Sequence, residues 1–184
     1  MINLRHEVNI LYLPSDDSIF LSNVVNQYHG VTALEIGTNS GIILRELLKN
    51  FSIVVGTDID FYSLRHVLKM SRNERVICCD AAAALGNMIF DMIVFNPPYL
   101  PTIKNHSDKT TDGGSSGIEV SIHFLLSAID KLSSNGKILM MVSTLSDIEE
   151  LDTFIVKNNL IKKEIAQKAL FYETLKIIEI SAYA

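Results

Sequence analysis

Short apolar runs alternate with helix-like segments along almost the whole chain after residue 30. Strands are predicted at 31–37, 52–58, 75–80, 90–96 and 136–143, and helices at 40–50, 61–71, 118–131 and 147–158. This alternation predicts an α/β fold, in which a mostly parallel sheet is covered by helices on both faces. Two last strands, near 160–168 and 173–183, follow one another without a helix. They should form an antiparallel hairpin and complete a seven-stranded sheet.

The chain is expected to form one domain. Its 184 residues suit a single core, and we find no internal repeat and no linker. A loop containing Pro14 and a helix opened by acidic and serine residues precede the first strand. We therefore predict an N-terminal loop and helix over 1–30 and a Rossmann-like core over 31–184.

The composition and the net charge argue against several classes of function. A hydrophobic content of 48% with 20% charged residues is typical of a soluble globular protein, and the net charge of −5 argues against a strong electrostatic hold on nucleic acid. The start MINLRHEVNI lacks the apolar region of a secretory signal, and no segment is long enough for a membrane span. A cytoplasmic protein without membrane attachment is the expectation.

Cysteine and histidine usage favours no metal site. Cys78 and Cys79 are adjacent in an apolar context, which favours reduced, buried thiols over a disulfide. The five histidines are scattered without the spacing of metal ligands.

A glycine-containing turn, LEIGTNSG (34–41), joins the first strand to the first helix of the core. In open parallel sheets, ligands bind beyond the carboxyl ends of the strands, near this point. Gly37 and Gly41 allow the backbone to approach a ligand closely. The spacing differs from the G-x-G-x-x-G of nicotinamide sites, which disfavours an oxidoreductase, and Glu35 would repel a pyrophosphate. A carboxylate there suits a ligand with an amino group or hydroxyls.

Acidic residues also follow the next two strands. Asp58 closes the second strand, about where an acid accepts hydrogen bonds from ribose hydroxyls, and Asp80 closes the third, where it would accept from an adenine amine. Each alone is more often a helix cap or a turn residue. Together with Glu35 and the glycine turn, they describe a nucleoside that carries a positive amino acid, which is S-adenosylmethionine.

The run FDMIVFNPPYLP (90–101) ends the fourth predicted strand in a rigid segment. Each proline fixes its own φ and favours extended geometry in the residue before it. Such a segment holds the side-chain oxygen of Asn96 and the carbonyl of Pro97 as acceptors for a planar –NH₂ group, while Tyr99 stacks on the substrate. The alternative is a strand exit that is only rigid.

These motifs together resemble a class I methyltransferase. NPPYLP followed by GGSSGIEV (113–120), the segment LYLPSDDSIFL (11–21) and the closing YETLKIIEI (172–180) are similar to the HemK/PrmC family of protein-glutamine N5-methyltransferases, in its short eukaryotic and archaeal branch. The resemblance covers essentially the whole chain. It differs from the family pattern at Asp16, Ser18 and Asn39, where the family has glutamate, threonine and glycine.

The resemblance implies an S-adenosylmethionine-dependent enzyme that methylates the glutamine of a Gly-Gly-Gln motif in a translation release factor. The implied catalytic residues are Asn96, Pro97 and Tyr99. The implied cofactor contacts are Ser18, Glu35, Gly37, Asn39, Gly41, Asp58, Asp80 and Asn96. The implied substrate contacts are Asn96, Pro97, Pro98, Tyr99 and Glu119, with the loop at 113–117 as a mobile flap over the substrate.

Two other functions stay open at this point. One is a nucleic-acid adenine N6-methyltransferase, because the exocyclic amine of adenine is also a planar –NH₂ and such enzymes share N-P-P-Y. The other is a cofactor-binding subunit that depends on a partner. The resembled branch pairs with a small zinc-binding activator, and an unprotected edge strand at 75–80 would be the place for it.

Overall fold

The computed structural model describes residues 16–70, 75–102 and 111–183. The described residues do not include Tyr12, an aromatic residue of the LYLPSDDSIFL segment. They also do not include residues 103–110, in the polar loop that follows the N-P-P-Y motif. In chain order, the elements are α1 (Asp16–Val25), β1 (Gly30–Ile36), α2 (Ile42–Asn50), β2 (Phe51–Asp58), α3 (Phe61–Met70), β3 (Arg75–Cys78), β4 (Phe90–Phe95), α4 (Glu119–Ile129), β5 (Leu132–Ser143), α5 (Ile148–Lys157), β6 (Leu160–Ala169) and β7 (Thr174–Ala182).

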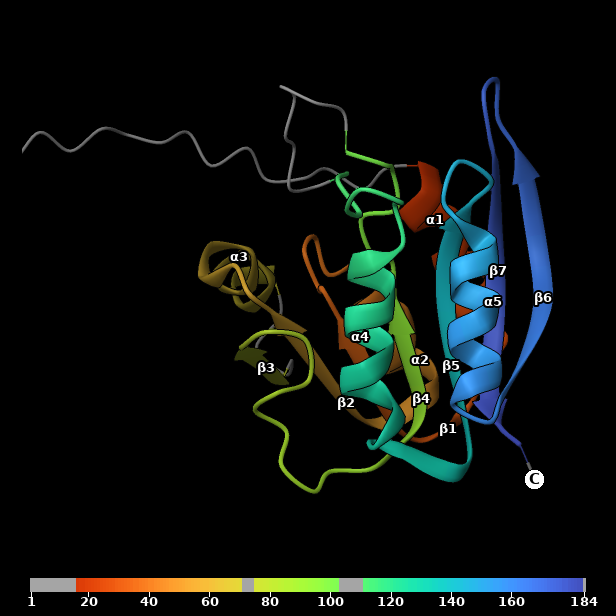
Figure 1. The fold of residues 1–184 in the computed structure, drawn as a ribbon. Helices are drawn as coiled ribbons and strands as arrows, with labels where there is room; N and C mark the ends of the chain where they lie inside the picture. The colour runs from red at the N-terminus through yellow and green to blue at the C-terminus, as the bar shows by residue number, and fades with distance from the viewer. Residues whose placement is uncertain (1–15, 71–74, 103–110, 184) are drawn as a thin grey trace, which may run out of the picture.

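The strands form one seven-stranded sheet in the order β3-β2-β1-β4-β5-β7-β6 (Figure 1). The strands from β1 to β5 pair in parallel, whereas β7 pairs antiparallel with both β5 and β6. The predicted mostly parallel sheet with a C-terminal antiparallel hairpin is confirmed. The expectation that the third strand lies at a sheet edge is also confirmed.

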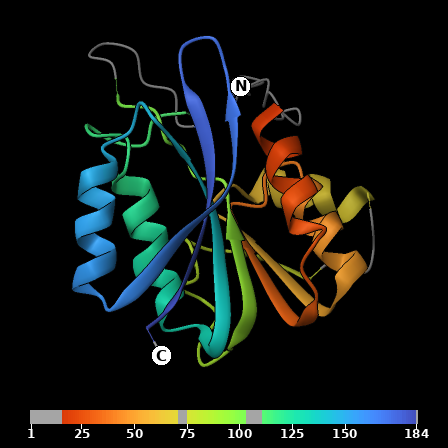
Figure 2. The same cartoon turned by 90° about the vertical axis from the view of Figure 1, so that its right-hand side faces the viewer.

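Helices cover both faces of this sheet. Figure 2 shows α1, α2 and α3 on one face and α4 and α5 on the other. Alternate residues of one strand therefore enter different cores: Met92 and Val94 of β4 pack toward α1 and α2, while Ile93 and Phe95 pack toward α4. Because both faces are buried, the central strands are apolar at nearly every position. This explains why they are visible in the sequence as continuous runs.

Two strand boundaries differ from the prediction by two residues or more. β3 ends at Cys78 and not at Asp80, since its register with β2 stops where Asp58 pairs with Cys78. β5 begins at Leu132 and not at 136, because an irregular stretch beside β4 pairs Phe90 with Leu132 before the regular ladder starts. Neither difference alters the strand order.

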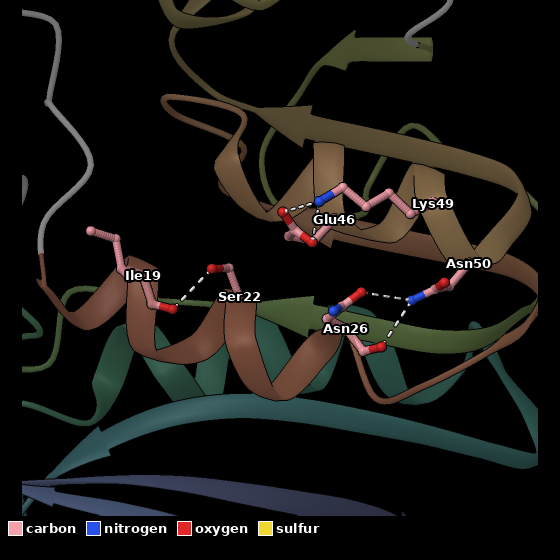
Figure 3. Close-up of polar contacts among 6 residues, drawn as sticks. All are labelled: Ile19, Ser22, Asn26, Glu46, Lys49 and Asn50. Carbon is pink, nitrogen blue, oxygen red and sulfur yellow. Dashed lines mark hydrogen bonds and ion pairs between the residues drawn. The ribbon is translucent and has the colours of Figure 1, made fainter.

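The N-terminal helix α1 is held against α2 at its far end. Asn50 of α2 donates its side-chain amide to the carbonyl and the side-chain oxygen of Asn26, just after α1, at 3.0 and 3.2 Å (Figure 3). Apolar residues of α1, among them Leu21 and Val25, lie in the core below it. These contacts hold α1 against α2, and its first turn lies at the opposite end, where Asp17 and Ser18 contact Asn96 after β4.

The sheet has a topological switch between β1 and β4. From β1 the chain goes to β2 and β3 on one side, and it then returns to place β4 on the other side. In such sheets the crevice beyond the carboxyl ends of the two central strands is the usual ligand site. Among the described helices, none has the length and apolar character needed to cross a bilayer.

Candidate active site

A cavity with about 590 Å³ of empty volume lies at this switch point. Three segments form its wall: the turn after β1, the N-P-P-Y segment after β4, and the first turn of α1. The lining residues are Asp17, Ser18, Glu35, Gly37, Thr38, Asn39, Ser40, Ile42, Ile43, Asn96, Pro97, Pro98, Tyr99, Leu100 and Thr111.

The turn after β1 has an unusual backbone. Gly37 and Asn39 have φ angles of 76° and 43°, in the left-handed region that glycine, and less readily asparagine, can occupy. Asn39 therefore meets the same conformational requirement as the glycine it replaces in the resembled family. The turn is tied to β2, since the amides of Gly37 and Thr38 donate to the carbonyl of Thr57 at 2.8 and 3.0 Å.

Asp58 holds this turn from the end of β2. Its carboxylate accepts from the amide of Asn39 at 2.8 Å and from that of Asp60 at 2.8 Å. Burial raises the pKa of Asp58 above its ordinary value, although the hydrogen bonds from the Asp60 and Asn39 amides oppose that shift. Asp58 holds the turn through these bonds and does not line the cavity, so its role as a cofactor contact stays a prediction.

Asp80 and Gly41 lie outside the lining as well. Asp80 is exposed, and its carboxylate lies 2.8 Å from Nε2 of His123 on α4. Gly41 begins α2, where a Cβ atom would meet Val67 of α3 at 2.9 Å, so this glycine permits close packing of the two helices. Sequence reasoning did not single out His123.

Asn96 has the most informative side chain of the cavity. Its Nδ2 donates to a carboxylate oxygen of Asp17 at 3.1 Å and to the hydroxyl of Ser18 at 3.3 Å. Its Oδ1 is buried and has no hydrogen-bond partner among the described residues. A buried, unpaired amide oxygen is costly, so such an atom in a native protein requires an explanation, of which a catalytic role, a water molecule and an ion are examples.

Asp17 is a site residue that sequence reasoning missed. It is only 8% exposed, and its Oδ2 accepts from both Asn96 and the hydroxyl of Tyr99, each at 3.1 Å. The signal available in the sequence was its place between Asp16 and Ser18 in the LYLPSDDSIFL segment. Nothing in that segment distinguishes the two neighbouring acids, because the distinction depends on how α1 docks.

The N-P-P-Y segment is fixed on its other side by two loops. The hydroxyl of Ser146, after β5, donates to the carbonyl of Tyr99 at 2.6 Å. The glycine loop packs on the same backbone: the amide of Gly113 donates to the carbonyl of Leu100 at 2.8 Å, and a Cβ on Gly113 would lie 2.7 Å from the carbonyl oxygen of Pro98. The predicted flap at 113–117 is therefore anchored behind the N-P-P-Y segment, and none of its residues lines the cavity.

Glu119 caps the loop that leads into α4. Its carboxylate accepts from the amides of Ser116 and Ile118 and from the hydroxyl of Ser115. Desolvation raises its pKa, but the hydrogen bonds from Ser115 and Ser116 outweigh this and lower the pKa to about 2. These contacts are structural and Glu119 is absent from the lining, so its role as a substrate contact stays a prediction.

The cavity brings together most of the predicted site. Ser18, Glu35, Gly37, Asn39, Asn96, Pro97, Pro98 and Tyr99 line it, whereas Gly41, Asp58, Asp80 and Glu119 do not. Glu35 is 2% exposed and lies one residue before the end of β1. Two backbone turns and one helix start converge at this candidate site, where the buried Oδ1 of Asn96 has no hydrogen-bond partner among the described residues.

Comparison with protein families gives a match over most of the chain. The family model of the Eco57I restriction-modification methylases matches residues 42–171. This span begins just after the glycine turn and includes the N-P-P-Y segment, the glycine loop and the β6–β7 hairpin tip.

Individual relatives are similar over different lengths. The chain is 29% identical over 149 residues to a Methanocaldococcus jannaschii protein assigned as an N5-glutamine methyltransferase, which is 76% of each chain. It is 30% identical over 103 residues to the eRF1 methyltransferase catalytic subunit of Schizosaccharomyces pombe, which is 52% of this chain and 44% of that one.

Among solved structures, the fold is similar to one chain of the E. cuniculi Mtq2–Trm112 complex, which is responsible for methylation of the eRF1 termination factor. The TM-score is 0.77 with 23% sequence identity, and the match covers 93% of this chain and 98% of that one. The fold is accordingly the Rossmann-like fold of class I methyltransferases, as the sequence predicts.

Proposed function

The chain belongs to the family of the Eco57I restriction-modification methylases, and from this premise we propose that it transfers a methyl group from S-adenosylmethionine to a side-chain amide nitrogen. The proposed substrate is the glutamine of the Gly-Gly-Gln motif in a translation termination factor. The relatives from M. jannaschii and S. pombe support this choice, since they are an assigned N5-glutamine methyltransferase and an eRF1 methyltransferase subunit. Because termination takes place on ribosomes, we place the activity in the cytoplasm.

The observation that carries the proposal is the buried Oδ1 of Asn96. A glutamine amide is planar and offers two N–H donors, and it needs acceptors that hold it in one orientation. Oδ1 of Asn96 has no hydrogen-bond partner among the described residues, and Pro97 lies beside it in the cavity wall. We assign the two N–H groups to this oxygen and to the carbonyl of Pro97.

These acceptors address the main obstacle to the reaction. An amide nitrogen is a weak nucleophile because its lone pair is delocalised into the carbonyl group, so its orientation toward the methyl carbon matters most. Hydrogen bonds to both N–H groups fix the nitrogen, and the two acceptor oxygens favour the positive charge that develops on it. Tyr99, fixed through its hydroxyl and its carbonyl, is placed to flank the flat amide.

The residues at the β1 end fit the cofactor. The left-handed turn at Gly37 and Asn39 lets the backbone approach a ligand, and the buried acid Glu35 suits its amino group or hydroxyls. When bound, S-adenosylmethionine supplies an electrophilic methyl group on a sulfonium that leaves as a neutral thioether. We assign cofactor contacts to Ser18, Glu35, Gly37, Asn39 and Asn96, and contacts at the nucleoside end to Asp58 and Asp80.

One other substrate is favoured by a specific observation. The matching family is that of restriction-modification methylases, whose name points to DNA, and the amine of adenine is also a planar –NH₂. The net charge of −5 is unfavourable for holding a phosphate backbone. Protein therefore remains the preferred substrate, and DNA is an outcome that the assay below must test.

A small partner protein is proposed at the β3 edge of the sheet. β3 has four residues and lies at the edge, where unpaired backbone groups are available to a partner. Large apolar side chains are exposed on and just before the neighbouring helix α3, including Ile59, Phe61 and Met70. The Trm112 subunit of the similar E. cuniculi complex motivates this proposal, and zinc binding by the partner is part of it.

The deciding experiment is methyl transfer from labelled S-adenosylmethionine. The substrates are a release factor, its Gln→Ala variant at the Gly-Gly-Gln motif, DNA and RNA, each with and without a small zinc-binding partner of the proposed type. The Asn96→Ala enzyme is the control. We expect label in the release factor alone, and we expect its loss with either substitution.

Other outcomes are equally decisive. Label in DNA or RNA in preference to protein would replace glutamine by adenine as the substrate. Equal activity with and without the partner, from a protein that sediments as a stable monomer, would contradict the proposed heterodimer.

A further inference from the structure

The carboxylate of Asp17 lies between two residues of the N-P-P-Y segment. Its Oδ2 is 3.1 Å from Nδ2 of Asn96 and 3.1 Å from the hydroxyl of Tyr99, and its Oδ1 is 2.6 Å from the amide of Ser18. The residue is more than nine-tenths buried. A single carboxylate from the start of α1 thus contacts both functional side chains of a segment about 80 residues away.

We propose that Asp17 is a positioning residue for methyl transfer, which sets the orientation of the Asn96 amide. This inference rests on the proposed function of the site. It assigns no direct contact between Asp17 and the substrate, and it assigns the effect to the orientation of the Asn96 amide.

The hydrogen-bonding properties of the Asp17 carboxylate determine how the Asn96 amide is oriented. A carboxylate oxygen accepts hydrogen bonds, so the Asn96 atom that faces Asp17 must be the amide nitrogen, and Oδ1 must face the opposite way. The hydroxyl of Ser18, at 3.3 Å from the same nitrogen, does not define this orientation because it can donate as well as accept. Without Asp17, the amide can rotate by half a turn and present its –NH₂ to the substrate amide. Two donor groups would then face each other.

The neighbouring acid offers a matched control. Asp16 precedes Asp17 in the same turn of α1, but its side chain is 83% exposed, and the structure places it 3.6 Å from Lys168 on β6. The sequence resemblance aligns Asp16 with the family glutamate, whereas the geometry gives the contact with Asn96 to Asp17. Removing either acid changes the net charge equally, so a difference between the two variants reports position and not charge.

The kinetic test uses Asp17→Ala, Asp17→Asn, Asp16→Ala, Asn96→Ala and the double variant Asp17→Ala/Asn96→Ala, with the release factor as substrate. We expect Asp17→Ala to lower kcat by about 10- to 100-fold, as is common when a group that orients a reacting side chain is lost, with KM for S-adenosylmethionine within about twofold. Asp17→Asn keeps the side-chain volume and loses one hydrogen-bond acceptor, so its kcat should fall less. This variant replaces Asp17→Ala in the test if Asp17→Ala does not fold. Asp16→Ala should match wild type.

The double variant separates positioning from general structure. If Asp17 acts through Asn96, then Asp17→Ala/Asn96→Ala should be about as slow as Asn96→Ala alone, because the two losses are not additive. If the two losses multiply, Asp17 does not act through Asn96 and the inference is wrong.

A second readout needs no substrate. The side-chain ¹⁵N–¹H signals of Asn96, assigned by their disappearance in Asn96→Ala, should shift in Asp17→Asn and stay unchanged in Asp16→Ala. Unchanged signals in Asp17→Asn would overturn the inference even in an active enzyme. Conversely, a shift in a protein that methylates none of the tested substrates would support the positioning role and reject only the proposed substrate.

Discussion

The two halves of the cavity are held together in different ways. At the β1 end, the contacts Thr38–Thr57 and Asn39–Asp58 join residues 19 positions apart, in the turn after β1 and at the end of the neighbouring parallel strand β2. At the β4 end, the contacts Asp17–Asn96 and Asp17–Tyr99 join residues 79 and 82 positions apart. The first half is a local motif of the α/β unit, whereas the second depends on the docking of a helix from outside that unit.

Hydrogen bonding also differs between the halves. The carboxylate of Asp58 is occupied by two amides of its own turns. In the β4 half, every contact to Asn96 goes to its nitrogen, and its oxygen is left without a partner among the described residues. In the β1 half, the bonds to Asp58 hold the turn in shape, whereas the β4 half leaves one buried acceptor unpaired, which the proposed function assigns to the substrate.

The largest expected effect tests this acceptor. Asn96→Ala removes the only side-chain oxygen that the proposal assigns to the substrate amide. It should lower kcat by about 10²- to 10³-fold, as the loss of one pre-organised polar group at a reacting centre does. Labelled methyl transfer to the release factor measures the change. Asn50→Ala removes an amide at the other end of the α1–α2 contact and should leave kcat unchanged. Activity of Asn96→Ala near that of Asn50→Ala would remove the main support for the proposed function.

The same contrast explains how much could be predicted from the sequence. The mostly parallel sheet, the hairpin and the glycine turn follow from the apolar runs and from short-range motifs, since parallel strands with crossover helices have few possible arrangements. The positive φ of Asn39 was not predictable, because asparagine occupies both the left-handed and the right-handed regions. Asp17 and Ser146 were missed since each contacts the N-P-P-Y segment from an element whose docking has no sequence signature.

A glycine behind the N-P-P-Y segment tests whether its backbone must stay in place. In Gly113→Ala, the new Cβ would lie 2.6 Å from the carbonyl oxygen of Gly117 and 2.7 Å from that of Pro98, so the glycine loop and the N-P-P-Y segment must move apart. We expect a loss of about 1–3 kcal/mol in the free energy of unfolding and a fall in kcat. Gly86→Ala is the matched control. It has a φ of 54° and no heavy atom within 4 Å of the added Cβ, so it should lose about 1–2 kcal/mol through strain alone.

Urea denaturation and methyl transfer, measured on both variants, separate the two effects. If Gly86→Ala loses as much kcat as Gly113→Ala, the activity depends on overall stability and not on the position of the segment.

A smaller effect, on the free energy of unfolding, is expected at Glu119. The direction of its pH dependence follows from the lowered pKa of this carboxyl group. The pKa of Glu119 is lowered in the folded protein to about 2 from an ordinary value of 4.5. The ionised form therefore stabilises the fold at pH values above 4.5, and this contribution is lost as the pH falls through about 2. Glu119→Gln should cost about 1 kcal/mol at pH 7, as the loss of a capping group does.

The difference in unfolding free energy between wild type and Glu119→Gln should shrink from pH 7 to pH 3 in urea titrations. Glu149→Gln, at an exposed acid in the first turn of α5, is the control and should show a smaller change over this range. An effect of Glu119→Gln on KM for the release factor, with stability unchanged, would instead restore the predicted substrate contact.

The smallest effect concerns Asn39, the one position where the turn departs from the resembled family. Asn39→Gly relieves the residual strain of a left-handed residue but adds backbone freedom to the unfolded chain. Because these terms oppose each other, the free energy of unfolding should change by no more than about 0.5 kcal/mol, whereas Asn39→Ala should cost about 1 kcal/mol. Calorimetric titration of Asn39→Gly with S-adenosylmethionine should give a Kd within about twofold of wild type. The reason is that the backbone amide of residue 39 still donates its hydrogen bond to Asp58 in every variant. A tenfold tighter Kd for Asn39→Gly would show that the asparagine side chain obstructs the cofactor, and that the β1 half does more than hold a shape.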